Sequence, residues 1–180
     1  MKPFILLATR ADDAPADAEY EAFLIRTGLR ERDLCRVRLE SEPMPDIDMD
    51  AYSGIMVGGS PFNTSTPEDV KSDTQRRVEA EFTALLDRVV AADFPFLGAC
   101  YGIGTLARHQ GAVIDATYAE EVGAPEITLT AAGLADPLCA GITPTFQAFV
   151  AHNDAIFTPP PGAVVLATSQ PCPVQMLRMR

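Results

Sequence analysis

The sequence predicts an α/β fold of three layers (α/β/α), built on a mostly parallel sheet, with a small antiparallel portion near its C-terminal end. Two observations predict it. Over the first 110 residues, short apolar runs alternate with segments of helical spacing, the pattern of strand–helix–strand units. From residue 120 onward, short apolar runs are separated by turns rich in proline and glycine, which is typical of hairpins.

The first half of the chain supplies the predicted parallel strands and their helices. Buried strands are predicted from compact apolar runs at 4–9 and 52–57, and a strand nearer the sheet edge from alternating apolar and charged residues at 34–39. Helices are predicted at 16–27, where Gly28 provides a stop signal, and at 75–92, where apolar residues recur at helical spacing. The polar segments 41–50 and 64–73 are predicted loops.

The second half begins with a short apolar strand at 94–98, followed by a helix at 103–110 and extended structure at 111–114. Short strands are then predicted at 127–129, 146–150, 164–167 and 174–177. The chain has 180 residues and contains neither an internal repeat nor a low-complexity linker, so we expect a single domain over residues 1–180.

Composition excludes several classes of partner. The formal net charge is −11 and only two lysines occur, so nucleic acid and anionic membranes are not expected partners. No apolar run is long enough to span a bilayer, and the run at 4–9 is too short for a signal peptide. We therefore expect a cytoplasmic protein.

The cysteine pattern indicates free thiols. Cysteines stand at 35, 100, 139 and 172, without a Cys-x-x-Cys pair, and they are too dispersed to predict a zinc site. The two histidines, His109 and His152, add no metal-ligand spacing. We expect no metal and no cofactor.

One cysteine stands in a setting that predicts chemistry. The segment Gly98-Ala99-Cys100-Tyr101-Gly102 follows an apolar run and precedes a predicted helix, which is the layout of a nucleophile elbow with cysteine in place of serine. Flanking glycines allow the sharp turn, and the helix N-terminus favours a thiolate at Cys100. The alternative is that Cys100 is one more small buried apolar residue, the commonest role of a free cysteine.

A second glycine pair predicts an oxyanion site. Gly58-Gly59 follows a strand that we expect to lie beside the elbow strand. Acyl chemistry at a thiol needs backbone N–H groups directed at the developing oxyanion. Tyr101, the residue after the nucleophile, can supply one N–H and Gly59 the other. The alternative is an ordinary glycine turn.

Three motifs in chain order carry a resemblance to class I glutamine amidotransferase domains: Gly58-Gly59, the run from Gly98 to Gly102, and His152-Asn153-Asp154 followed by Ala167-Thr168-Ser169. The resemblance implies a flavodoxin-like fold and a reaction in which Cys100 attacks the side-chain amide of glutamine. Ammonia leaves, and water hydrolyses the glutamyl thioester. The resemblance further implies that the backbone N–H groups of Gly59 and Tyr101 hold the oxyanion.

The chain departs from the family pattern near the substrate. Gly104 stands where the family usually has a glutamine that helps to bind the substrate side chain. By the resemblance, the predicted substrate-binding residues are Gly58 and Gly59 of the glycine loop, and Gly104. Ser60 stands where the family commonly has proline.

The larger departure concerns the catalytic base. The family's catalytic His and Glu lie one strand beyond the Ala-x-Ser region, and the sequence ends at Arg180, before that segment. His152 belongs to the His-x-Asp segment and is expected to fix a loop, and His109 is expected to point away from the thiol. We expect a domain without its C-terminal strand and helix, from a longer parent that carries the His and Glu.

Three hypotheses stay open from the sequence. The first is a glutamine amidotransferase-like cysteine hydrolase that takes glutamine or a related amide and has, as a possible partner, a separate ammonia-accepting synthetase. The second is a catalytically inactive amidotransferase fold that acts as a binding or regulatory module. The third is a cysteine hydrolase of the same fold that acts on another amide or γ-glutamyl bond, for which Gly104 would leave room.

Overall fold

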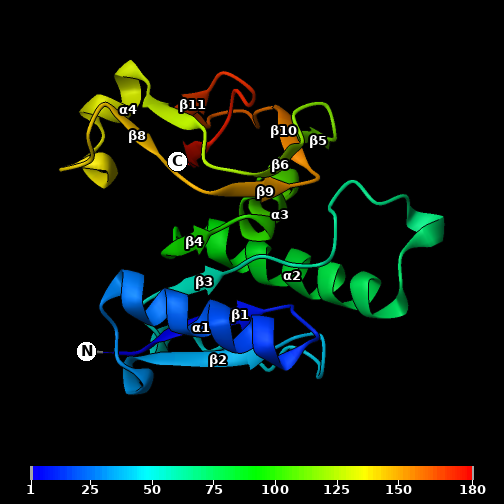
Figure 1. The fold of residues 1–180 in the computed structure, drawn as a ribbon. Helices are drawn as coiled ribbons and strands as arrows, with labels where there is room; N and C mark the ends of the chain where they lie inside the picture. Colours follow the sequence, from blue (N-terminus) through cyan, green and yellow to red (C-terminus); the bar gives the residue numbers. More distant parts are fainter. Residues whose placement is uncertain (1, 180) are drawn as a thin grey trace. The chain divides into compact units, whose positions relative to one another are not determined.

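A computed structural model describes residues 2–179 and has a mixed α/β fold (Figure 1). The chain forms two compact units, the first ending at Leu106 and the second beginning at Ala107. Among the described residues, no helix combines the length and apolar character needed to cross a membrane.

The first unit is a parallel sheet with its connecting helices. Its strands are β1 (Phe4–Ala8), β2 (Leu34–Arg38), β3 (Ile55–Val57) and β4 (Phe96–Gly98), in the order β2-β1-β3-β4. The α-helices are α1 (Asp13–Thr27) and α2 (Asp73–Ala91), together with α3 (Tyr101–His109), which begins in this unit and ends in the second. Short 3₁₀ turns lie at Glu31–Asp33, Met49–Ala51 and Glu68–Val70. Each neighbouring pair of strands is parallel, the arrangement of an open doubly wound sheet.

Helices α1 and α2 cover opposite faces of this sheet, because successive strand side chains point to opposite faces. Ile5 and Leu7 of β1 pack in one buried cluster with Val78 and Phe82 of α2. Leu6, which lies between them in β1, belongs to a second cluster with partly buried residues of α1. The first unit therefore has the predicted three layers.

Local signals explain the helix ends. Gly28 follows α1 in the left-handed conformation, with φ of 70°, which suits glycine at a helix C-terminus. The Ser72 hydroxyl accepts a hydrogen bond of 3.1 Å from the Gln75 backbone N–H and caps α2. Helix α1 starts three residues before the predicted position, since Pro15 is tolerated in the first turn of a helix.

The second unit consists of short antiparallel strands. They are β5 (Val113–Asp115), β6 (Glu120–Gly123), β7 (Glu126–Leu129), β8 (Thr145–Gln147), β9 (Val150–His152), β10 (Ala155–Thr158), β11 (Val164–Ser169) and β12 (Met176–Arg178), with helix α4 (Ala131–Ala135) and a 3₁₀ turn at Pro137–Cys139. They form one four-stranded sheet, β12-β11-β7-β8, and the pairs β10-β5 and β6-β9. The four-stranded sheet buries Ile127, Leu129 and Leu166.

Most predicted elements are present, and the differences have local causes. The predicted run at 146–150 is divided between β8 and β9, which lie in different sheets. Strands β6 and β10 and helix α4 were not predicted, because strand β6 (Glu-Glu-Val-Gly) lacks an apolar run and α4 has only five residues.

Candidate active site

Cys100 lies at a sharp turn between strand β4 and helix α3. Strand β4 ends at Gly98 and α3 begins at Tyr101, so the connection is only two residues long. Cys100 has φ of 54°, a left-handed conformation that is uncommon outside glycine and asparagine and costs on the order of 1–3 kcal/mol. The surrounding structure thus holds the cysteine in a strained backbone conformation.

The two flanking glycines are required by close approach of the backbone. A Cβ atom on Gly98 would lie 2.4 Å from the carbonyl carbon of Gly102, and one on Gly102 would lie 2.6 Å from the Val57 carbonyl oxygen. Both distances are shorter than real Cβ contacts. Any larger residue at either position would therefore push the turn away from the neighbouring strand.

The Gly58–Gly59 loop lies beside this turn, as the sequence predicted from neighbouring strands. Strands β3 and β4 pair in parallel, with Val57 opposite Gly98. The Gly102 N–H donates to the Gly58 carbonyl at 3.2 Å, and the Ala99 N–H donates to the Val57 carbonyl at 2.8 Å. These bonds fix the loop after β3 against the turn that carries the thiol.

Burial and charge act in opposite directions on the Cys100 thiol. Cys100 is exposed, yet the protein around its thiol removes enough water to raise its pKa, and the Glu19 carboxylate raises it further. Hydrogen bonds from the backbone N–H groups of Tyr101 and Ser60, and the positive charge of Arg10, lower the pKa. Loss of water is the largest effect, so the pKa is raised, whereas the helix N-terminus alone predicted a lowered value.

An ion pair between Arg10 and Glu19 packs against the glycine loop. Arg10 follows β1, and Glu19 lies in α1. The Arg10 Nε donates to Glu19 Oε1 at 3.0 Å, and the Gly59 N–H donates to the same oxygen at 2.8 Å. The Glu19 side chain is only 11% exposed. Sequence reasoning missed both residues; the available signal was an acid on a helix that follows a buried strand.

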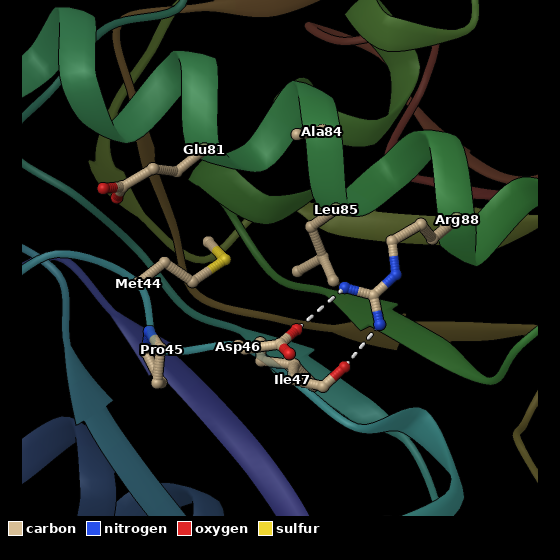
Figure 2. Close-up of a pocket in the computed structure, with 8 residues that line it drawn as sticks. All are labelled: Met44, Pro45, Asp46, Ile47, Glu81, Ala84, Leu85 and Arg88. Atoms are coloured by element: carbon tan, nitrogen blue, oxygen red, sulfur yellow. Dashed lines mark hydrogen bonds and ion pairs between the residues drawn. The ribbon is translucent and has the colours of Figure 1, made fainter.

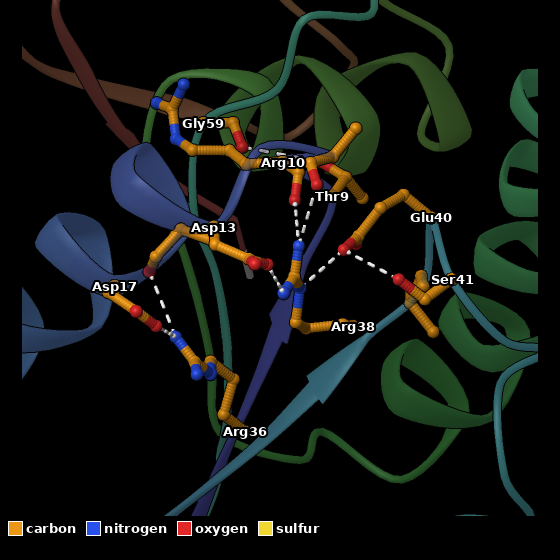
Figure 3. A network of polar contacts seen from close by, with 12 residues as sticks. Thr9, Arg10, Asp13, Asp17, Arg36, Arg38, Glu40, Ser41 and Gly59 are labelled. Carbon is orange, nitrogen blue, oxygen red and sulfur yellow. Dashed lines mark hydrogen bonds and ion pairs between the residues drawn. The ribbon is translucent and has the colours of Figure 1, made fainter.

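The turn that carries Arg10 is held by a network of polar contacts from β2 (Figure 3). The Arg38 guanidinium donates to the backbone carbonyls of Arg10 and Ala11, at 3.1 and 2.8 Å, and pairs with Asp13 and Glu40. These contacts hold the pKa of Arg38 above its ordinary value, with its hydrogen bond to Asp13 the largest cause. The position of Arg10 is therefore fixed through its backbone.

Tyr101 is buried by two aromatic rings. Its ring makes edge-on contacts with Phe62 and Phe82, each with centroids 6.3 Å apart. Such packing anchors the first residue of α3 and with it the backbone N–H that reaches Cys100. Gly104, a predicted substrate-binding residue, lies in the first turn of α3, where its N–H donates to the Cys100 carbonyl at 3.5 Å.

Both histidines belong to the second unit. His109 is the last residue of α3, and its Nδ1 lies 2.8 Å from the Gln110 amide nitrogen. His152 lies opposite Glu120 in the β6–β9 pair, and its Nε2 is 2.8 Å from Glu120 Oε2. Residues 1–106 contain no histidine.

Glu120, His152 and Cys172 form the one group among residues 2–179 whose side chains could together hold a metal ion, with ligand atoms within 4.8 Å of one another. The Glu120 carboxylate already accepts from His152 and, at 2.6 Å, from the Gln175 amide. Cys172 is buried, and its thiol donates to the Val174 carbonyl at 3.6 Å. Hydrogen bonds thus engage Glu120 Oε2, His152 Nε2 and the Cys172 thiol, while His152 Nδ1 is buried without a hydrogen-bond partner.

A pocket of about 330 Å³ also opens in the first unit, between helix α2 and the loop after β2 (Figure 2). Arg88 spans it, donating to the Ile47 carbonyl and pairing with Asp46 at 3.5 Å. Its lining residues come from the loop after β2 and from α2, and they include none of the site residues described above.

Fold and site together define a class: α/β proteins with a cysteine at the turn between a parallel strand and a helix. The model of the glutamine amidotransferase class-I family matches residues 17–179. The chain belongs to this family.

Similar proteins agree with this assignment. The chain is 29% identical over 126 residues to a glutamine-hydrolysing GMP synthase of Xanthomonas oryzae, covering 67% of this chain and 21% of that protein. Among solved structures, a glutamine amidotransferase from Thermotoga maritima matches with a TM-score of 0.78 at 16% identity, covering 99% of this chain and 72% of that one. SMU.1228c matches with a TM-score of 0.76 at 24% identity, covering 97% and 71%. These structures show a shared fold, and the chain spans about a fifth of the curated relatives.

Proposed function

We propose that this chain is a glutamine amidotransferase-like cysteine hydrolase with Cys100 as the nucleophile of a nucleophile elbow. The Cys100 sulfur, as a thiolate, attacks the carbon of the glutamine side-chain amide and forms a C–S bond. The C–N bond breaks, and the nitrogen leaves as ammonia after taking a proton. Water then hydrolyses the thioester and releases glutamate and the thiol.

The observation that carries the proposal is the conformation of Cys100 itself. A non-glycine residue at φ of 54°, between two glycines that admit no side chain, supports a function for the thiol. A small buried apolar residue would have no need of such a turn, and Cys100 is exposed.

In the proposed reaction, backbone N–H groups stabilise the oxyanion. Tyr101 is the first proposed donor, and its N–H reaches the Cys100 thiol. The second comes from the loop after β3, where the sequence favours Gly59. We propose that Gly58, Gly59 and Gly104 bind the substrate. Because Gly104 replaces the family's usual glutamine, the site has room for an amide other than glutamine or for a γ-glutamyl bond.

A second candidate function is a binding or regulatory module without turnover. Two observations favour it: the pKa of the Cys100 thiol is raised, and no histidine occurs among the residues of the first unit. A protonated thiol without a base is a weak nucleophile at neutral pH. The leading proposal therefore requires a general base that takes the proton from the thiol.

For an active enzyme we propose a separate synthetase as the acceptor of ammonia. The support is the similarity to glutamine-hydrolysing GMP synthases, of which this chain spans only about a fifth.

Ammonia release from glutamine tests the proposal, with Cys100→Ala as the test variant and Cys35→Ala as the matched control. Cys35 is also an exposed free cysteine, in β2, but it lies outside the candidate site. We expect the wild type and Cys35→Ala to release ammonia at similar rates and Cys100→Ala to release none. Ammonia release that survives Cys100→Ala refutes the nucleophile, and its absence from the wild type favours the binding module.

A further inference from the structure

The Glu19 carboxylate is placed where an ordinary surface acid would not be. It reaches from α1 to the glycine loop, with 11% of its side chain exposed and Oε2 buried without a hydrogen-bond partner. A buried carboxylate loses its hydration, and an ion pair with Arg10 offsets this only in part. Such a placement indicates that the carboxylate has a task at the loop.

The side chains of Glu19 and Arg10 pack directly against the two glycines that follow β3. A Cβ atom on Gly58 would lie 2.5 Å from the Glu19 carboxylate carbon, and one on Gly59 would lie 2.4 Å from Arg10 Nη2. The Thr9 hydroxyl also donates to the Gly59 carbonyl at 3.3 Å. The backbone of Gly59 is therefore held at both its N–H and its carbonyl.

This arrangement decides which N–H groups are available at the thiol. The Gly59 N–H already donates to Glu19 Oε1 at 2.8 Å, so it would have to leave the carboxylate before it could serve an oxyanion. The next N–H along the loop, that of Ser60, reaches the Cys100 thiol together with the N–H of Tyr101.

We propose that Glu19 is a positioning residue: by holding the Gly59 N–H, it directs the Ser60 N–H towards Cys100 as the second backbone donor. The proposal rests on the proposed function in naming what this donor stabilises during turnover. The placement of the donor itself can be tested without turnover.

Two variants of Glu19 separate the effect of its negative charge from the effect of its hydrogen bond with the Gly59 N–H. Glu19→Gln removes the negative charge and keeps a carbonyl oxygen that can accept from both Gly59 and Arg10. Glu19→Ala removes the charge and the acceptor. Loss of the negative charge lowers the pKa of the Cys100 thiol in both variants, because Glu19 raises it. Only Glu19→Ala also frees the loop and loses the hydrogen bond from the Ser60 N–H to the thiol. Because this hydrogen bond lowers the pKa of the Cys100 thiol, its loss raises the pKa.

The test is titration of the Cys100 thiol by thiolate absorbance, as a difference from Cys100→Ala in each background. Glu21→Gln is the control, since Glu21 is an exposed acid on the same helix. Thermal unfolding establishes that each variant is folded. We expect the pKa in Glu19→Ala to be higher than in Glu19→Gln and Glu21→Gln to match the wild type. Equal values in the two Glu19 variants, or a lower value in Glu19→Ala, would overturn the positioning role.

Turnover adds a second readout. If the wild type releases ammonia, Glu19→Ala should lose about 10-fold more kcat than Glu19→Gln, a smaller loss than the roughly 100-fold that follows removal of a whole oxyanion donor. An equal kcat in the two variants contradicts the proposal. If the wild type releases no ammonia, the proposed function fails, while the difference in thiol pKa still decides the role of Glu19.

Discussion

Among single residues, Cys100 has a thiol whose pKa depends on opposing effects of its neighbours. Arg10 and two backbone N–H groups favour the thiolate, while loss of water and the Glu19 carboxylate favour the thiol. The motif identified Cys100 from sequence because its glycines are local in the chain. The effects of Arg10 and Glu19 depend on a contact across 40 residues, between Glu19 and Gly59, which no local pattern reports.

The raised pKa predicts how Cys100 reacts with a simple alkylating reagent such as iodoacetamide. The thiolate is the reactive form, so the alkylation rate should still rise with pH above the ordinary pKa range of a cysteine. Peptide mass spectrometry at a series of pH values gives the rate for each cysteine. A Cys100 rate that levels off near neutral pH would show a lowered pKa and contradict the balance described above.

At the scale of elements, the sequence was sufficient for the parallel half of the fold. Helix α2 has strong helical spacing and a serine cap, and β1 and β3 are compact apolar runs; each carries its own local signal. The antiparallel half was predicted less completely. Strand β6 has no apolar run, and it is defined by its pairing with β9, a contact between segments about 30 residues apart.

The turn that carries Cys100 is packed so closely that adding a single methyl group should destabilise the protein. Gly98→Ala should destabilise the protein by about 1–3 kcal/mol, because its Cβ would lie 2.4 Å from the Gly102 backbone. The unfolding midpoint in urea measures the change. Gly123→Ala is the control, since its Cβ would meet only an ordinary contact at 3.7 Å. Equal midpoints for Gly98→Ala and the wild type would mean that the turn is looser than described.

At the scale of the whole molecule, the acidic composition shapes the response to pH. The formal net charge is −11, yet several carboxylates have partners that lower their pKa. They are Asp13, paired with Arg38; Asp33, with Arg30; Glu68, with Lys71; and Asp136, with Arg178. A carboxyl group with a lowered folded-state pKa contributes stability above its unfolded pKa and loses it as the pH falls through the folded value.

We therefore expect the free energy of unfolding to decrease as the pH falls below the ordinary carboxyl pKa of about 4. The Asp136→Asn variant should be less stable than the wild type at pH 7, because it loses the ion pair with Arg178, and the difference should shrink in acid. Thermal unfolding across this range measures both. A difference that stays constant with pH would show that Asp136 stabilises the fold without its charge.

The proposed function depends on Cys100 being a nucleophile for a glutamine-like substrate. It is tested most directly by incubation with a glutamine-mimicking electrophile, followed by intact and peptide mass spectrometry. We expect a single adduct on Cys100, slowed by added glutamine, with the exposed Cys35 unmodified on the same time scale. Equal modification of Cys100 and Cys35, unaffected by glutamine, would contradict it.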